Sequence, residues 1–171
     1  MYFFKEPSQA RTVFDIRPGE GQDTPFSPVL DRRFVGIRIA APPIVEYVPG
    51  LSYDPFDGDF LYVPISMTYQ FSAAYFARFD AIDAHMVAMA LNPRTGMSYC
   101  GAVRQGEVVK ISRGAPVPLE VLQRTFYTRF LTFNLAQLLQ LPDEDAVYHI
   151  HVTLETYQSN VVTLQMRRPV P

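Results

Sequence analysis

The stretch "LPDEDAVYHIHVTLETYQSNVVTLQM", Leu141–Met166, carries the clearest strand pattern of the chain. In its first half four apolar residues alternate with polar ones, as on a strand with one buried face: Tyr148, Ile150, Val152 and Leu154. The segment "TYQSN" then turns the chain, and a second alternation follows in Val162, Leu164 and Met166. The pattern predicts two antiparallel strands whose inner faces contribute to a hydrophobic core.

Strand patterns continue upstream of this stretch. Residues 61–71, "LYVPISMTYQF", alternate throughout, which predicts a long strand. Pro64 has no amide hydrogen, so we expect an edge position or a bulge there. A first strand is predicted in "RRFVGIRIA", with Val35, Ile37 and Ile39 on one face, and a short edge strand is predicted at 44–48.

The middle of the chain predicts a β-meander. The segment "NPRTG", Asn92–Gly96, reverses one hairpin, and Gly96 can supply the positive φ that such a turn often needs. A second turn is predicted at "RQGE", 104–107. Residues 115–133, "APVPLEVLQRTFYTRFLTF", predict one or two further strands after a proline-rich bend.

Helical patterns are short. The segment "SAAYFARFDAIDA", 72–84, predicts a helical turn or a loop. The segment "NLAQLLQL", 134–141, has leucines at helical spacing behind a capping Asn134, and Pro142 ends it. The chain therefore predicts an all-β fold with one short crossover helix. The 15 prolines agree with short strands joined by turns.

Composition limits the domain organisation and the compartment. The 171 residues suit an irregular N-terminal arm over 1–30 and one β-sandwich domain over 31–171. The formal net charge of -2 gives no basic surplus for nucleic acid, and no apolar run is long enough to span a membrane. The first residues have too short an apolar run, and no basic region before it, to predict a signal peptide. We expect a cytoplasmic protein if Met1 is the native start, and a periplasmic or secreted one if a leader was removed.

The segment "EDAVYHI", Glu144–Ile150, resembles the D-x-A-x-Y-x-C motif of immunoglobulin domains. Ala146 and Tyr148 match the motif, while Ile150 stands at the position of the cysteine. The resemblance implies an immunoglobulin-like antiparallel β-sandwich in which an aliphatic side chain replaces the disulfide. It also implies that the Tyr148 hydroxyl bonds back to the preceding corner. Another sandwich or a barrel is the alternative.

The segment "NPRTGMSY", Asn92–Tyr99, is similar to the N-P-T-T-G-Y-x-W loop of the chagasin-like cysteine-peptidase inhibitors. Arg94 and Met97 depart from that pattern, and the second loop of the family has no counterpart. The segment "RRPV", 167–170, is similar to part of its third loop. This resemblance implies peptidase inhibition through the Asn92–Gly96 loop, whereas ordinary turn chemistry explains the same residues.

Several residues could carry chemistry. His149 and His151 share one strand face and would bind zinc or copper if other elements supplied further ligands; a solvated strand face is the simpler interpretation. Cys100 has no flanking base, so a buried structural thiol is expected. The acidic segment "YDPFDGDF", 53–60, lacks the calcium-loop pattern and is interpreted as a turn.

The sequence therefore predicts a non-catalytic protein-binding module without a cofactor. A bacterial immunity, inhibitor or secretion-associated protein fits this description, with a toxin or hydrolase as its partner. Loop residues on a rigid scaffold are the usual contacts of such modules. We expect the partner at Arg94, Thr95, Tyr157 and Gln158.

Overall fold

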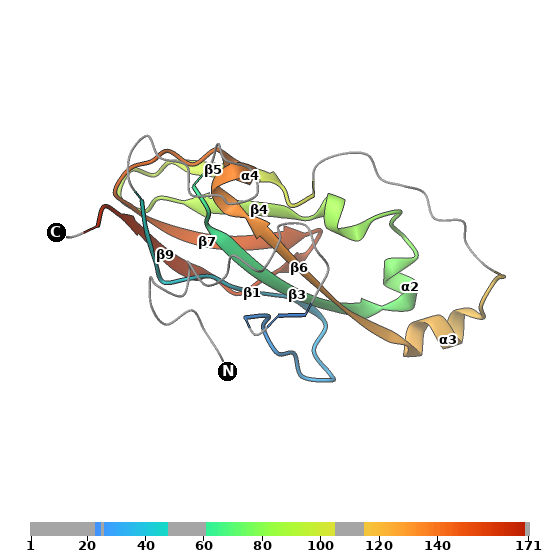
Figure 1. Ribbon diagram of the computed structural model, residues 1–171. Helices are drawn as coiled ribbons and strands as arrows, with labels where there is room; N and C mark the ends of the chain where they lie inside the picture. Colours follow the sequence, from blue (N-terminus) through green and yellow to red (C-terminus); the bar gives the residue numbers. More distant parts are fainter. Residues whose placement is uncertain (1–22, 25, 48–60, 105–114, 170–171) are drawn as a thin grey trace.

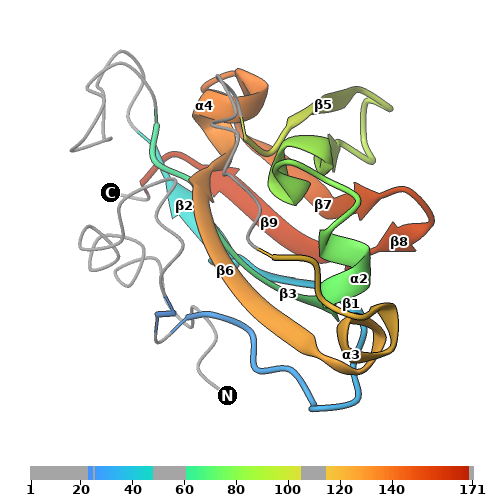
Figure 2. The ribbon, with the colours of Figure 1, turned by 90° about the vertical axis from the view of Figure 1, so that its right-hand side faces the viewer.

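The computed structural model describes residues 23–24, 26–47, 61–104 and 115–169, which form two β-sheets and several short helices (Figure 1). The sheets face each other across one hydrophobic core, to which both contribute side chains (Figure 2). The fold is β-rich, as predicted. Most of the predicted arm over 1–30, the turn at 104–107 and the acidic segment 53–60 lie outside the described residues.

The smaller sheet has three antiparallel strands in the order β1-β3-β6. Their bounds are Gly36–Ala40 for β1, Pro64–Ser72 for β3 and Phe126–Asn134 for β6. The edge or bulge predicted at Pro64 is wrong, because β3 is the central strand. Proline is tolerated because Pro64 is the first residue of β3. The neighbouring strand β1 ends opposite Ser66, so β1 has no residue beside Pro64 that would need a backbone hydrogen bond from it.

The start of β1 also departs from prediction. Ile37 and Ile39 are buried as expected, but Val35 is exposed. Gly36 separates Val35 from Ile37 with a φ of 137° and therefore breaks the alternation at the first residue of the strand.

The larger sheet has the order β2-β9-β7-β4-β5, with β8 pairing with β7 as a sixth strand. Its strands are β2 (Ile44–Glu46), β4 (Val87–Leu91), β5 (Ser98–Ala102), β7 (Ala146–Leu154), β8 (Tyr157–Gln158) and β9 (Val162–Arg167). The strand β2 runs parallel to β9. The sheet is therefore mixed, and the prediction of purely antiparallel strands is wrong at this edge.

The helices are α2 (Ala73–Phe76), η2 (Ile82–His85, a 3-10 helix), α3 (Leu119–Arg124) and α4 (Leu135–Leu139). The predicted crossover helix is confirmed as α4, which leads from β6 in one sheet to β7 in the other. Its cap is also confirmed, because the Asn134 Oδ1 accepts from the Ala136 amide at 3.2 Å. The prediction of one helix is wrong, since α3 replaces a predicted strand.

The stretch at the C-terminal end folds as predicted. The four apolar residues of β7 are buried, with Tyr148 and Ile150 both 0% exposed, and β7 pairs antiparallel with β9. An aliphatic side chain thus packs at the position where the motif has cysteine. No helix within the described ranges is long and apolar enough to cross a membrane.

Candidate functional site

The predicted contact residues lie in two places. Arg94 and Thr95 are exposed in the turn between β4 and β5, beside the start of β7. Tyr157 and Gln158 form β8, which pairs with the last residues of β7. Because β7 has nine residues, the two pairs are separated by roughly 25 Å. They do not form one surface.

The turn after β4 is held by a buried asparagine. The Asn92 side chain accepts from the amides of Arg94 and Thr95, at 3.0 and 3.3 Å, and Asn92 is 3% exposed. The Gly96 amide donates to the Asn92 carbonyl at 2.9 Å, and Gly96 has a φ of 73°. The predicted turn and its glycine are confirmed.

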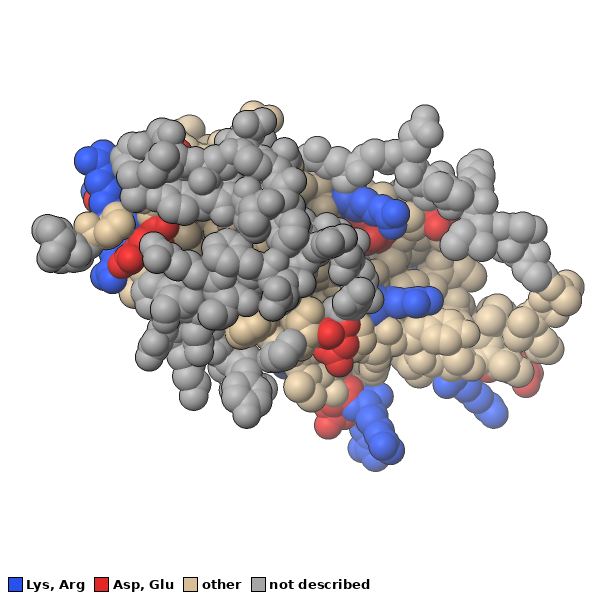
Figure 3. All heavy atoms as spheres, in the orientation of Figure 1, with Lys and Arg blue, Asp and Glu red and all other residues tan. Residues whose placement is uncertain are grey.

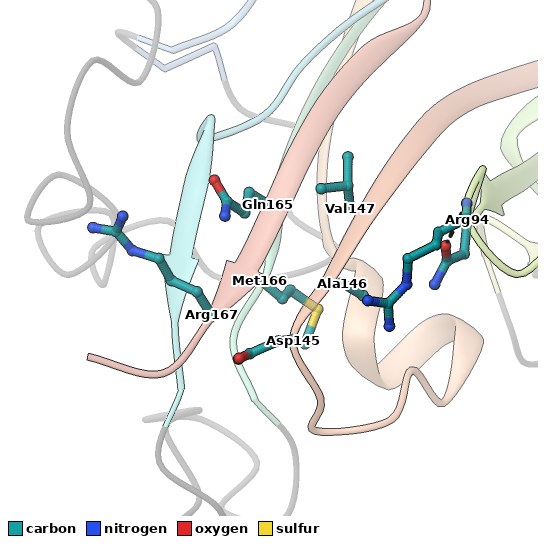
Figure 4. Close-up of a pocket in the computed structure, with 8 residues that line it drawn as sticks. Arg94, Asp145, Ala146, Val147, Gln165, Met166 and Arg167 are labelled. Atoms are coloured by element: carbon teal, nitrogen blue, oxygen red, sulfur yellow. Dashed lines mark hydrogen bonds between the residues drawn. The ribbon is translucent and has the colours of Figure 1, made fainter. Parts of the chain in front are cut away.

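A small pocket of about 240 Å³ lies next to this turn. We call this region, the pocket and the β4–β5 turn together, the polar end. Asp145 borders the pocket, and its Oδ1 already accepts from the Tyr47 hydroxyl at 3.1 Å and the Arg168 amide at 2.9 Å. Arg94 and Arg167 lie on opposite sides of the pocket, and their guanidinium groups do not face one another (Figure 4). These two cations therefore do not converge on one ligand.

The other end of β7 is built from aromatic rings. We call this cluster the aromatic end; it consists of Phe71, Tyr75, Phe76, Phe79, Tyr127 and Tyr157. The Phe71 ring lies 4.7 Å from Tyr75 and 4.9 Å from Tyr157, centroid to centroid. The predicted contact Tyr157 is thus half-buried among rings from β3 and α2. Such edge and stacked contacts stabilise the cluster beyond simple burial.

Glu155 ties this cluster to the hairpin between β7 and β8. Its φ is 51°, a left-handed conformation that disfavours a residue with a side chain. Its carboxylate accepts from the Tyr75 hydroxyl and from the Arg78 guanidinium, each at 2.8 Å. Burial raises the pKa of Tyr75 to about 12, and the hydrogen bond to Glu155 adds to the shift. Glu155 therefore connects the hairpin to α2 and the residues that follow it.

Beside the aromatic end lies an exposed apolar surface that the sequence interpretation missed. We call it the apolar projection; it consists of Val117, Leu119, Val121, Phe126 and Tyr127. Each of these side chains is about half exposed, and α3 has no buried residue. In the space-filling view, the end of the molecule over α3 and the start of β6 shows mostly uncharged side chains (Figure 3).

A signal for this surface was present in the sequence. Leu119 and Val121 are two residues apart, and on a helix such a pair points in widely different directions. A single helix face cannot bury both. The segment was interpreted as a strand, on which the same spacing would put both residues on one buried face.

The edge of the small sheet is open where β6 begins. Four consecutive residues of this strand are exposed, Phe126 to Arg129. The Arg129 guanidinium lies over the Tyr127 ring at 5.9 Å. At the opposite edge of the same sheet, the Asn160 side chain binds the backbone of Ile39 through two hydrogen bonds, at 2.9 and 3.0 Å. One edge is closed by a side chain and the other is accessible.

The candidate chemical residues lie apart from each other on the outer face of the larger sheet. Cys100 and His151 are both opposite Met89, so a whole strand separates them by about 10 Å. The expectation of a buried Cys100 is wrong, since it is exposed. His149 and His151 are half-buried, and no group of three metal-binding side chains occurs among the described residues.

Tyr148 does not form the predicted corner bond. Its ring is buried, but its hydroxyl has no hydrogen-bond partner within the described part of the chain. Burial raises the pKa of Tyr148 to about 12, with smaller contributions from Tyr99 and Glu144. Tyr148 thus fills the core as the motif requires without forming the motif's hydrogen bond.

Comparisons with known proteins add no relative: no family model matches the chain, and neither the curated proteins nor the solved structures give a match.

Proposed function

We propose that this chain is a non-catalytic protein-binding module that contacts its partner through the apolar projection. The observation that carries the proposal is the concentration of exposed apolar side chains between residues 117 and 127. Contiguous apolar surface of this kind is typical of interaction sites, and aromatic residues commonly anchor them. Tyr157 packs against Tyr75 of α2, and α2 contacts α3, so we include Tyr157 and Gln158 in the proposed surface.

The kind of module proposed is a bacterial immunity, inhibitor or secretion-associated protein, with a toxin or hydrolase as partner. The support is analogy, because rigid β-rich scaffolds often present recognition surfaces at one end. An immunoglobulin-like topology is part of the proposal. It is supported by the buried Tyr148 and Ile150 and by the crossover through α4. The parallel strand β2 and the unbonded Tyr148 hydroxyl depart from that pattern.

The non-catalytic part of the proposal is supported by the spacing of the reactive side chains. A cysteine or serine nucleophile needs its base within hydrogen-bonding reach, about 3 Å. Cys100 is separated from His151 by Met89, and Ser98 is separated from His149 by Leu91 in the same way.

Position-dependent photo-crosslinking tests the binding surface. A benzophenone amino acid is placed at Leu119 or at Tyr127, and the control is Val161, which is 54% exposed in a loop away from the apolar projection. In the native host we expect a discrete crosslinked product from Leu119 and Tyr127 and none from Val161. Equal crosslinking at all three positions would contradict the proposed surface.

A second candidate function is cysteine-peptidase inhibition through the Asn92–Gly96 loop. The observation that favours it is the exposure of Arg94 and Thr95 in the turn that the Asn92 side chain holds. Inhibition of a papain-type protease that is lost on changing Thr95 and Gly96 would support this candidate. Crosslinking at Leu119 without protease inhibition would reject it.

A further inference from the structure

Along β6, the backbone amide and carbonyl groups of alternate residues point toward β3 and away from it. At the two ends of the β3–β6 ladder, the Ala73 amide donates to Thr125 and the Leu135 amide donates to Val63, at 2.7 and 2.8 Å. Backbone direction alternates along a strand, so the odd-numbered residues of this segment face β3. The amide and carbonyl groups of the even-numbered residues, 126, 128 and 130, therefore point away from the sheet.

These outward groups lie in the accessible half of the strand. Phe126 and Thr128 are exposed and Phe130 is half-buried, whereas Leu131 to Asn134 are buried. Within the described chain, β6 pairs only with β3. The exposed half has no proline and one charge, Arg129, so it lacks the usual features that prevent edge pairing.

Building on the proposed protein-binding function, we propose that the partner at this edge is a second copy of the chain. The two β6 strands pair antiparallel about a two-fold axis at Thr128. Phe126 then lies opposite Phe130 of the second copy, and Thr128 lies opposite Thr128. Residues 126, 128 and 130 all face outward. Three pairs therefore form across the axis, 126 with 130, 128 with 128 and 130 with 126, and each pair can exchange two backbone hydrogen bonds.

Side chains favour this register. It places aromatic opposite aromatic and threonine opposite threonine, which are stabilising cross-strand pairs. It also places Arg129 opposite Tyr127 of the second copy, extending the cation–π contact that the two residues make within one chain at 5.9 Å. An axis at Phe130 would instead place Arg129 opposite Leu131, which is buried.

The apolar projection supplies the area for such a dimer. Five side chains that are each about half exposed present on the order of 500 Å² of apolar surface. The two-fold axis doubles this contribution to about 1,000 Å², the lower bound for a specific interface. We therefore expect a dimer of moderate affinity, populated at micromolar concentrations.

Sedimentation velocity of the full chain between about 1 and 100 µM tests the pairing. The unmodified chain should shift from monomer to dimer in this range. Thr128→Pro removes one outward amide donor from each copy without removing a donor to β3, so dimerisation should weaken at least tenfold. Thr128→Val is the matched control: it loses the hydroxyl bond to Gln70 but keeps the amide, and it should still dimerise. A circular-dichroism spectrum confirms that both variants are folded.

Disulfide trapping provides a second readout that does not depend on affinity. In a Cys100→Ser background, which removes the chain's single cysteine, Thr128→Cys places two thiols across the axis. Opposed residues of a hydrogen-bonded antiparallel pair have Cα atoms about 5.5 Å apart, which a disulfide can span. Thr128→Cys should form a covalent dimer on oxidation, and Val161→Cys should not.

The outcomes separate the two proposals. A chain that is monomeric at 100 µM and whose Thr128→Cys variant does not link overturns the second copy as partner. If Leu119 then crosslinks to a different protein, the binding function stands with another occupant. If Leu119 crosslinks to nothing, both proposals fail.

Discussion

The two ends of β7 are stabilised in different ways. At its start, the polar end, a buried asparagine accepts the amides of the adjacent turn, and Asp145 accepts from Tyr47 and Arg168. At its other end, aromatic rings pack against each other and leave apolar side chains in solvent. Hydrogen bonds hold the turn at the first end, where Leu91, Met97 and Val147 are exposed around it. At the second end the exposed apolar side chains are more numerous and adjoin the ring cluster. That difference is why the proposed interface lies at the aromatic end.

The largest expected effect is at the aromatic end. Phe71 is 0% exposed and its ring contacts Tyr75, Phe76 and Tyr157. Phe71→Ala removes these contacts and leaves a cavity, so the free energy of unfolding should fall by about 3–5 kcal/mol. Urea unfolding monitored by circular dichroism measures the change. A loss below about 1 kcal/mol would mean that the rings do not stabilise this end.

The corresponding change at the polar end should cost less. Asn92→Ala removes the acceptor of the Arg94 and Thr95 amides and should lower the free energy of unfolding by about 1–3 kcal/mol. Asn92→Asp keeps an acceptor oxygen and is the matched control. If Asn92→Ala costs more than Phe71→Ala in the same urea experiment, the contrast between the ends is reversed.

The fold was predictable where the periodicity was long. The alternation in 148–154 gave the buried face of β7, and the cap at Asn134 gave the crossover helix. The parallel pairing of β2 with β9 was not predictable, because a three-residue strand carries no signal of its partner or direction. Pro64 was misinterpreted because its tolerance depends on where the neighbouring strand ends.

The candidate site was less predictable than the fold. The sequence predicts Tyr157 as a contact residue, but the aromatic rings that pack against it, those of Phe71 in β3 and Tyr75 in α2, are far away in sequence. The apolar projection was missed because α3 was interpreted as a strand. Whether an apolar residue such as Leu119 is exposed depends on what the fold brings next to it, and periodicity alone does not report that.

Removing the hydroxyl group from either of two tyrosines should change the free energy of unfolding by about 1 kcal/mol, in opposite directions. The buried Tyr148 hydroxyl has no partner within the described residues, so Tyr148→Phe should raise the free energy of unfolding by up to about 1 kcal/mol. The Tyr47 hydroxyl donates to Asp145, so Tyr47→Phe should lower it by about the same amount. Thermal unfolding of both variants measures the difference. If Tyr148→Phe is instead destabilised, the Tyr148 hydroxyl does form a hydrogen bond in the unmodified chain, as the immunoglobulin motif implies.

A smaller effect is expected at Glu155. Glu155→Ala loses the bonds to Tyr75 and Arg78 and keeps the unfavourable positive φ. Glu155→Gly loses the same bonds but adopts that φ without strain, so it should be more stable than Glu155→Ala by about 0.5–1 kcal/mol. Equal stability of the two variants in urea would show that the backbone at this hairpin is unstrained.

The last effect is absent at neutral pH and appears only in alkali, and it again compares the two ends. Below pH 10 a tyrosine is protonated in both folded and unfolded chains, so it adds no pH dependence. Above pH 10 the unfolded chain loses its phenolic protons first, whereas burial holds the pKa of Tyr148 at about 12. The free energy of unfolding therefore falls as the pH rises from 10 to 12, because the unfolded chain releases the Tyr148 proton more readily than the folded chain does. Urea midpoints across this range should fall less steeply for Tyr148→Phe than for the unmodified chain.

Tyr75→Phe is the matching variant at the aromatic end, because the pKa of Tyr75 also rises to about 12. It should flatten the same alkaline decline, but it also loses the bond to Glu155 and so should begin from a lower midpoint at pH 7. Tyr148→Phe should begin from an equal or higher midpoint. Two tyrosines with similar pKa values would thus behave differently at neutral pH, because one hydroxyl is bonded to a carboxylate and the other is buried without a described partner. Curves for the two variants that coincide at pH 7 and over the whole range would remove this distinction between the ends.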